Sequence, residues 1–215
     1  FTISFFINIY PQNFVVGYYF DAYKSILPYS KIKLENLTHI IHAFAWPDTS
    51  GEISFYQGML NPLLNETVHD SGKKILLAFG GWGQSDGFSK MSADSGYRKN
   101  FIDNVVDILT DNDYDGIDLD WEFPASLNEG KNLTILVKEL RAKFNEVNPE
   151  LLITMAVNPG NWYGQRHEYE KMIPDMDWFA MMGYDFHGSW SSHTGHNAPL
   201  FPPASGCFDG SCSEG

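Results

Sequence analysis

Three carboxylate side chains alternate along one short apolar segment near the middle of the chain. Asp118, Asp120 and Glu122 stand at positions i, i+2 and i+4 of the run DGIDLDWEFP. On a β-strand these positions share one face and are spaced by about 6.6 Å per pair of residues. Because buried carboxylates this close together resist ionising at the same time, one or more of their pKa values should rise. Such a group suits general acid–base catalysis near neutral pH, and Glu122, just before Pro124, is the expected proton donor.

The neighbours of these acids have simpler interpretations. Leu119 and Trp121 alternate with the carboxylates, so they are expected to face the opposite side of the strand and to pack against helices. Asp115 precedes Gly116 at the turn into the strand. It is interpreted as a structural residue and not as a catalyst.

The same region also satisfies a calcium-loop pattern. Residues 111–122 read DNDYDGIDLDWE, which fits the EF-hand pattern D-x-[DN]-x-[DN]-G-x₅-E. However, Asp118 stands where that loop needs an apolar residue, and Phe123-Pro124 follows where a helix should begin. The sequence contains no second, pairing EF-hand pattern. The match is therefore interpreted as coincidence, and because the histidines show no metal-ligand spacing either, neither a metal nor a cofactor is predicted.

Short apolar runs separated by longer amphipathic segments must position these residues. The expected strands are Val15–Phe20, His39–Ala45, Lys74–Gly81, Gly116–Phe123, Leu151–Val157 and Trp178–Asp185. Helical spacing recurs in Phe101, Val105 and Leu109, and again in Leu133, Leu136, Val137, Leu140 and Phe144. This alternation predicts a parallel α/β sheet. Six strands fit either an open doubly wound sheet or part of a (β/α)₈ barrel, and periodicity alone does not distinguish the two.

Composition restricts the partners and the compartment. The 215 residues carry a formal net charge of −13, which repels phosphate backbones and argues against a nucleic-acid partner. No internal stretch has the length of a membrane span, so no membrane partner is predicted. Sequons at Asn36, Asn65 and Asn132 support secretion only weakly. Cys207 and Cys212 are spaced for a small local disulfide at most.

Three motifs resemble one enzyme family. The run DGIDLDWEFP resembles the signature D-x-x-D-x-D-x-E of the family-18 glycoside hydrolases, the chitinase family. The segment LAFGGW at 77–82 is similar to that family's third strand, and MGYD at 182–185 to its sixth-strand motif M-x-Y-D. The segments FHGSW at 186–190 and TGHNAPL at 194–200 are similar to the branch that includes animal chitinases. The resemblance runs in the family's order from about Val15 to Leu200.

This resemblance implies a (β/α)₈ TIM-type barrel of which the chain holds about the first six β/α units. Residues 1–14 are then expected to be a lead-in or a signal-peptide remnant, and residues 15–215 a partial catalytic domain. The chain is accordingly expected to be part of a longer polypeptide, whose activity is a separate question from the activity of this piece.

The resemblance also implies roles for individual residues. Glu122 would protonate the glycosidic oxygen while the substrate's own N-acetyl carbonyl attacks the anomeric carbon, a substrate-assisted exception among glycosidases. Asp120 would orient the acetamido group, Asp118 would share a proton with Asp120, and Tyr184 would hydrogen-bond the acetamido group. The implied substrate-binding residues are Asp185, Met182, Tyr18, Trp82, Gly81 and Phe44. Tyr18 could equally be a core residue, and Trp162 and Trp190 are weaker candidates for sugar stacking.

The expectation is therefore a secreted, monomeric, endo-acting chitinase that retains anomeric configuration and acts on chitin or chito-oligosaccharides. Two other functions share these motifs. One is an inactive chitin-binding lectin on the same fold, and the other is an endo-β-N-acetylglucosaminidase that acts on N-glycans. Retention of Asp118, Asp120 and Glu122 favours an enzyme over a lectin, and the residues around YDFHGSW favour chitin.

Overall fold

One curled sheet organises the computed structural model, which describes residues 14–201. The strands are β1 (Val16–Phe20), β2 (His39–Pro47), β3 (Ile53–Phe55), β4 (Lys74–Gly80), β5 (Gly116–Asp120), β6 (Leu152–Val157) and β7 (Trp178–Met181). Six of them are parallel and adjacent in the order β1-β2-β4-β5-β6-β7, while β3 pairs antiparallel with β2. The predicted parallel α/β sheet is confirmed, and the short strand β3 was not predicted.

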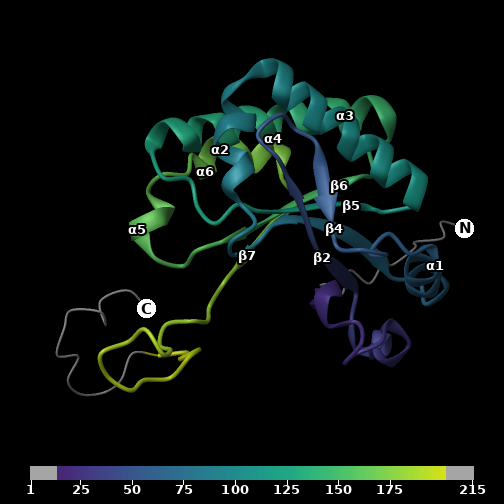
Figure 1. The fold of residues 1–215 in the computed structure, drawn as a ribbon, viewed down its shortest axis with the longest axis horizontal. Coiled ribbons are helices and arrows are strands. Elements are labelled where there is room, and N and C mark those ends of the chain that lie inside the picture. The colour runs from purple at the N-terminus through teal and green to yellow at the C-terminus, as the bar shows by residue number, and fades with distance from the viewer. Residues whose placement is uncertain (1–13, 202–215) are drawn as a thin grey trace, which may run out of the picture.

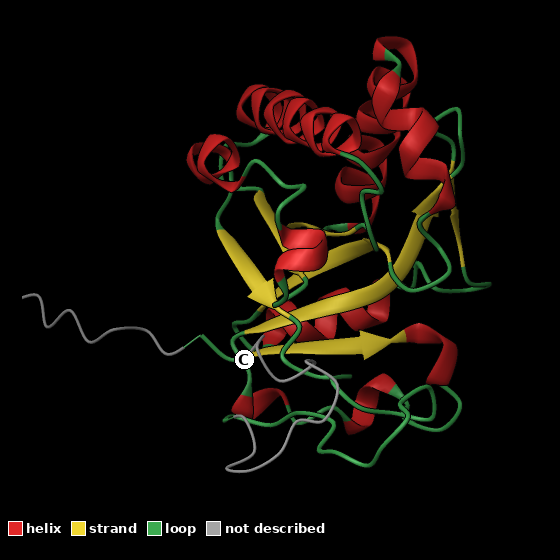
Figure 2. Ribbon diagram, turned by 90° about the vertical axis from the view of Figure 1, so that its left-hand side faces the viewer, coloured by secondary structure: helices red, strands yellow, loops and turns green. Residues whose placement is uncertain are grey.

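The strand order distinguishes the two architectures that the sequence left open. The parallel strands follow one another in chain order without the reversal that marks a doubly wound sheet. Helices α2, α3 and α4 gather on one face (Figure 1), and the strands splay around a common axis (Figure 2). This is the arrangement of consecutive β/α units in a (β/α)₈ barrel. The barrel prediction is therefore confirmed for the part of the chain that the structure describes.

The helices begin and end where their capping residues allow. They are α1 (Pro62–Asp70), α2 (Asp86–Ala93), α3 (Ser95–Asn112), α4 (Leu127–Val147), α5 (Asn161–Gly164) and α6 (Tyr169–Met172). The Asp94 side chain accepts from the backbone of Gly96 and Tyr97 to start α3, and the Ser126 hydroxyl accepts from Glu129 N to start α4. The apolar stripes predicted for α3 and α4 are buried in the core. The short 3₁₀ segments are η1 (Asp21–Tyr23), η2 (Tyr29–Lys31), η3 (Leu34–Asn36) and η4 (Ile173–Asp175).

Two strands are shorter than predicted by more than one residue. The expected strand Gly116–Phe123 stops at Asp120, and the expected strand Trp178–Asp185 stops at Met181. Strand β5 ends because its partner β4 turns away at Gly80, which has a φ of 112°, so the ladder finishes at the pair Gly80 and Asp120. Glu122 therefore lies beyond the strand, in the chain segment that follows it.

The two faces of the sheet carry different side chains, as the alternation in β5 predicted. Leu119 and Trp121 pack in the layer between sheet and helices, where the Trp121 ring stacks on Phe88 of α2 at 5.3 Å between centroids. Asp118 aligns with Ala78 of β4 and Thr154 of β6 on the other face. The acids thus project away from the helices, towards the inside of the curled sheet.

Asp115 has the structural role that was predicted for it. Its carboxylate accepts from Ile75 N at 2.8 Å and lies 2.9 Å from His69 Nε2, which ties the start of β5 to β4 and α1. Residues 111–122, which match the calcium-loop pattern, are divided between the end of α3, a turn, β5 and the two residues that follow β5. An extended strand cannot wrap its oxygens around one ion as an EF-hand loop does, so the match is a coincidence of sequence.

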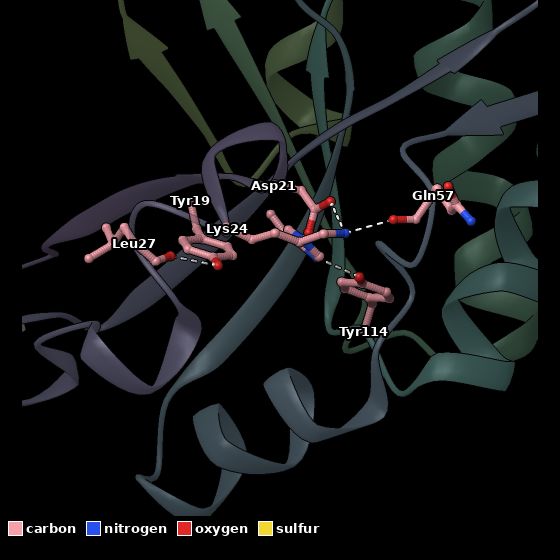
Figure 3. A network of polar contacts seen from close by, with 7 residues as sticks. Tyr19, Asp21, Lys24, Leu27, Gln57 and Tyr114 are labelled. Carbon is pink, nitrogen blue, oxygen red and sulfur yellow. Dashed lines mark hydrogen bonds and ion pairs between the residues drawn. The ribbon is translucent and has the colours of Figure 1, made fainter.

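A buried polar network fixes the end of β1 against β2 (Figure 3). The Asp21 carboxylate accepts from Lys24 Nζ at 2.8 Å and lies 3.2 Å from His42 Nε2. His42 Nδ1 lies 2.8 Å from the Tyr114 hydroxyl, and Lys24 also reaches Gln57 O. Burial raises the pKa of Asp21, but the contacts with His42 and Lys24 outweigh it and hold that pKa below its usual value. The network anchors η1 to the sheet.

Candidate active site

A cleft of about 870 Å³ opens at the carboxyl ends of the parallel strands. Its walls are formed by Phe44, Trp82, Asp120, Glu122, Phe123, Asn158, Tyr163, Met182, Tyr184, Asp185 and Trp190. Seven of these were predicted as site residues, and they come from the ends of β2, β4, β5 and β7 or the segments just after them. Active sites of parallel barrels form at this end of the strands, so the cleft is the candidate active site.

A second cavity, of about 620 Å³, lies at the opposite end of the sheet. Phe14, His39, Lys74 and Trp178 are among its lining residues, at or near the first residues of their strands. None of the three acids predicted to be catalytic lines it. The acids predicted to be catalytic therefore belong to the cleft at the carboxyl ends of the strands, and not to this second cavity.

Asp118 is fully buried beneath the cleft and is held by two hydroxyl groups. The Tyr18 hydroxyl donates to its Oδ2 at 2.7 Å, and the Thr154 hydroxyl donates to its Oδ1 at 2.5 Å. Burial raises the pKa of Asp118 to about 6, although both hydrogen bonds oppose the rise. Burial also raises the pKa of Tyr18, so this phenol remains a hydrogen-bond donor. Tyr18 therefore acts on Asp118 and is not part of the cleft lining.

Asp120 is buried at the bottom of the cleft and is only 5% exposed. Its Oδ1 is a buried oxygen with no hydrogen-bond partner among the described residues. Burial is the main cause that raises the pKa of Asp120 to about 8, and the charges of the neighbouring Glu122 and Asp118 carboxylates contribute to this rise. No hydrogen bond joins Asp120 to Asp118 within residues 14–201, so their predicted sharing of a proton has no direct contact in this conformation. The free Oδ1 remains an acceptor that a ligand N–H could satisfy.

Glu122 is half-buried in the cleft wall, two residues past the end of β5. Burial raises the pKa of its carboxyl, and the charge of Asp185 across the cleft adds to the rise. A glutamic acid in this environment keeps its proton to a higher pH than an exposed one does. The Glu122 backbone N–H donates to the Ser85 hydroxyl at 3.0 Å.

Tyr184 and Asp185 reach the cleft from the loop that follows β7, which is yellow in Figure 1. Burial raises the pKa of the Tyr184 phenol, and the charges of the nearby Asp120 and Glu122 raise it further. Asp185 adopts a φ of 59°, and its Oδ1 accepts from Asn197 Nδ2 at 2.8 Å. These contacts bring a protonated phenol and an anchored carboxylate opposite Glu122.

The aromatic wall contains both predicted and unpredicted residues. Phe44 lies on the inner side of the sheet and lines the cleft, and Trp82 leaves 81% of its surface exposed there. Gly81 does not line the cleft, although it was predicted to bind substrate. Instead it makes room for Phe44, because a Cβ at Gly81 would lie 3.1 Å from that ring and its φ is 88°. Trp190 lines the cleft, whereas Trp162 does not.

Sequence reasoning missed a stacked group on the other side of Glu122. The rings of Phe123 and Tyr163 lie 4.4 Å apart with an interplanar angle of 25°. Arg166 lies 4.9 Å over Tyr163 and donates to Pro124 O at 3.0 Å. The signal available was the aromatic and basic composition of the segment NWYGQR after β6. Thr154 was also missed; its signal was one hydroxyl residue in the otherwise apolar strand LITMAV.

Comparison with known proteins identifies the family. The model of the glycosyl hydrolases family 18 matches residues 15–212. A probable endochitinase of Caenorhabditis elegans is 34% identical over 182 residues, which cover 76% of this chain and 30% of that protein.

Solved structures agree with this relationship. A mutant family-18 chitinase from Cycas revoluta in complex with (GlcNAc)4 has a TM-score of 0.78 and 30% identity, covering 87% of this chain and 60% of that chain. The class V chitinase from Nicotiana tobaccum has a TM-score of 0.81 and 29% identity, covering 90% and 59%. The chain thus spans about a third of the length of the nematode relative and about three fifths of the solved chains. The sequence motifs, the barrel-type sheet and the family model agree: this chain belongs to the glycosyl hydrolases family 18.

Proposed function

We propose that the protein hydrolyses β-1,4-linked N-acetylglucosamine polymers, with chitin or chito-oligosaccharides as substrates. The observation that carries this proposal is the pairing of two groups in one cleft. Glu122 has a raised pKa suited to proton donation, and in the same cleft Asp120 presents a buried oxygen that has no hydrogen-bond partner among residues 14–201. Aromatic rings on the walls offer flat surfaces for sugar rings. The names of the relatives support the same substrate, since one of them is a chitinase in complex with (GlcNAc)4.

In the proposed mechanism, the protonated Glu122 donates its proton to the glycosidic oxygen as the bond from that oxygen to the anomeric carbon breaks. The carbonyl oxygen of the substrate's own acetamido group forms a bond to the anomeric carbon, which gives an oxazolinium ion. This intramolecular nucleophile is already positioned, so the protein need not supply one. Water then attacks the anomeric carbon as its bond to the acetamido oxygen breaks, Glu122 accepts a proton from the water, and the two displacements together retain the configuration.

The residues around Glu122 have roles that their surroundings support. The free Oδ1 of Asp120 would accept the acetamido N–H, and the carboxylate would stabilise the developing positive charge. Asp118 has the lower pKa of the two, about 6 against about 8 for Asp120, so it would share the proton held by Asp120 and leave Asp120 charged as positive charge develops on the substrate. The Tyr184 phenol, whose raised pKa keeps it protonated, would donate to the acetamido oxygen. Asp185 and Met182 would contact sugar hydroxyl and ring atoms.

The proposal is tested by measuring product release from chito-oligosaccharides by the full-length protein, with an N-glycan substrate in parallel. Release from the chito-oligosaccharide alone supports the proposed function. Release from the N-glycan alone would assign the protein to the endo-β-N-acetylglucosaminidases. Tight binding of chito-oligosaccharides without any release would show that it is a lectin.

Replacing Trp82 by Ala is expected to weaken substrate binding more than it slows the chemical step. The exposed Trp82 ring lines the cleft, and stacking of an aromatic ring contributes roughly 0.5–1.5 kcal/mol beyond area burial. KM for chito-oligosaccharides should therefore rise about three- to tenfold, with kcat changed less than twofold. Trp162→Ala is the matched control, because Trp162 is 67% exposed but does not line the cleft. Equal KM values for the two variants would show that Trp82 does not contribute to substrate binding.

We propose that the protein is extracellular, and the sequons provide a test. Asn36 is exposed in η3, whereas Asn65 is 3% exposed inside α1 and its Nδ2 donates to Asn112 O at 2.7 Å. A glycan on Asn65 is incompatible with this packing. After expression through a eukaryotic secretory pathway, Asn36→Gln should remove an endoglycosidase-sensitive mass shift and Asn65→Gln should leave the shift unchanged. A glycan found by mass spectrometry on Asn65 of the folded protein would contradict this. Within the described range, no helix is long and apolar enough to cross a membrane.

A further inference from the structure

Ser85 occupies the N-cap position of α2 but does not cap that helix. Serine at this position usually accepts a hydrogen bond from the first turn, and the Ser85 side chain makes no such bond. Its buried hydroxyl instead faces the end of β5. There Oγ accepts from Glu122 N at 3.0 Å and lies 3.2 Å from both Asp120 O and Gly81 O, to which its single proton can donate.

The backbone of Glu122 has little other support. Pairing of β5 with β4 ends at Asp120, and pairing with β6 ends at Leu119. Within the part of the chain that the structure describes, the Ser85 hydroxyl is the only hydrogen-bond partner of the Glu122 N–H. The peptide carbonyl of Asp120 is held from the same side, because Gly81 N also donates to it at 2.7 Å. One loop therefore binds the two peptide groups on either side of Trp121.

The Trp121 side chain, which lies between these two peptide groups in the sequence, is fixed by packing. Trp121 stacks on Phe88 of α2, the helix that begins directly after Ser85. The close approach of the two strand ends requires glycine at position 80, where a Cβ would lie 2.2 Å from Asp120 O. The stacking of the Trp121 ring and the hydrogen bond to the Ser85 hydroxyl together fix the backbone from which the Glu122 side chain leaves.

We infer that Ser85 is a positioning residue for the proton donor Glu122: its hydroxyl holds the backbone that aims the Glu122 carboxyl into the cleft. The inference rests on the proposed function. It adds a residue outside the cleft lining whose loss should impair proton donation specifically. Displacement of a reacting group by about 1 Å can reduce a rate by on the order of 10²-fold, so a single backbone hydrogen bond can have a large kinetic effect.

The test compares two substrates in the full-length protein. A 4-nitrophenyl chito-oligosaccharide has a leaving group that departs with little help from an acid, whereas a chito-oligosaccharide has a sugar leaving group that needs the proton. In Ser85→Ala, we expect kcat/KM for the chito-oligosaccharide to fall about tenfold to a hundredfold, and for the nitrophenyl substrate less than threefold. Ser85→Thr, which keeps the hydroxyl, should restore most of the difference. Ser92→Ala is the control, because Ser92 is a buried serine of α2 whose hydroxyl donates to Ser89 O of the same helix.

The outcomes separate the inference from the function on which it rests. A wild-type protein inactive on both substrates would overturn the proposed function and this inference with it. An active wild type whose Ser85→Ala variant loses both substrates equally would show that Ser85 supports only the fold. An unchanged Ser85→Ala variant would also overturn the inference. Selective loss for the sugar leaving group, with rescue by Ser85→Thr, supports it.

Discussion

Replacing Glu122 by Gln is expected to lower kcat/KM for chito-oligosaccharides by about a thousandfold, because the amide cannot donate a proton to the glycosidic oxygen. General acid catalysis by a positioned side chain is worth roughly 10²–10⁴-fold. The substitution keeps the size of the side chain in a half-buried wall, so substrate binding should survive. Kinetics of product release, together with binding measured by calorimetry, separate the two effects.

The role of Glu122 as a general acid also predicts how kcat/KM depends on pH. A general acid works in its protonated form, so wild-type kcat/KM should fall as pH rises through the pKa of Glu122. Burial raises that pKa, so the fall should come at higher pH than for an ordinary glutamic acid. This fall of kcat/KM with rising pH should be absent in Glu122→Gln. Glu150→Gln, at an exposed position, is the control and should keep both the wild-type kcat/KM and its fall at high pH. A Glu122→Gln variant with the wild-type kcat/KM and the wild-type fall at high pH would exclude Glu122 as the acid.

Asp120→Asn is expected to give a protein that is less active and more stable. An asparagine cannot become negatively charged as positive charge develops on the substrate, and loss of such electrostatic stabilisation of a transition state costs about 10²–10³-fold in kcat. Stability should move in the opposite direction, because Asp120 is buried with a pKa of about 8 and is disfavoured in its charged form. The folded state then binds a proton that the unfolded state releases, so the free energy of unfolding falls as pH rises from about 4 to about 8.

Replacing the Asp120 carboxyl by an amide should remove most of this fall in the free energy of unfolding. We expect Asp120→Asn to raise the free energy of unfolding at pH 7 by roughly 1–3 kcal/mol, and to leave it nearly unchanged at pH 4. Chemical denaturation of the wild type and the variant at pH 4, 6 and 8 measures the difference. Asp107→Asn, at an exposed position of α3, should change neither activity nor stability. A variant that is less stable than the wild type at pH 8 would contradict the assignment of a raised pKa.

The sequence predicted the parts of the fold that depend on local patterns. The six parallel strands follow from apolar runs, and α3 and α4 from apolar residues at helical spacing. The alternation in β5 correctly separated Asp118 from its outward neighbours Leu119 and Trp121. Strand length was less predictable, because β5 ends where Gly80 of another strand turns away. Such an ending depends on the partner strand and not on the residues of β5 itself.

The site was predictable to the same extent. Glu122, Tyr184 and Asp185 stand in recognisable motifs, and the structure brings them into one cleft. Ser85 and Thr154 could not be found in this way, because each acts through a contact between elements far apart in the sequence. Thr154 reaches Asp118 across 36 positions, and Ser85 reaches Glu122 across 37. The local sequence around a serine or threonine does not indicate which distant residue its hydroxyl will hydrogen-bond in the folded protein.

The most direct test of the proposed function follows the anomers released from a chito-oligosaccharide by the full-length wild-type protein and by Glu122→Gln, using time-resolved NMR. The wild type should release the β-anomer first, because the acetamido oxygen and then water attack the anomeric carbon in succession. The α-anomer should appear only later, by mutarotation, and Glu122→Gln should release almost no product in the same time. Initial release of the α-anomer, or β-anomer release at the wild-type rate by Glu122→Gln, would contradict substrate-assisted hydrolysis with Glu122 as the proton donor.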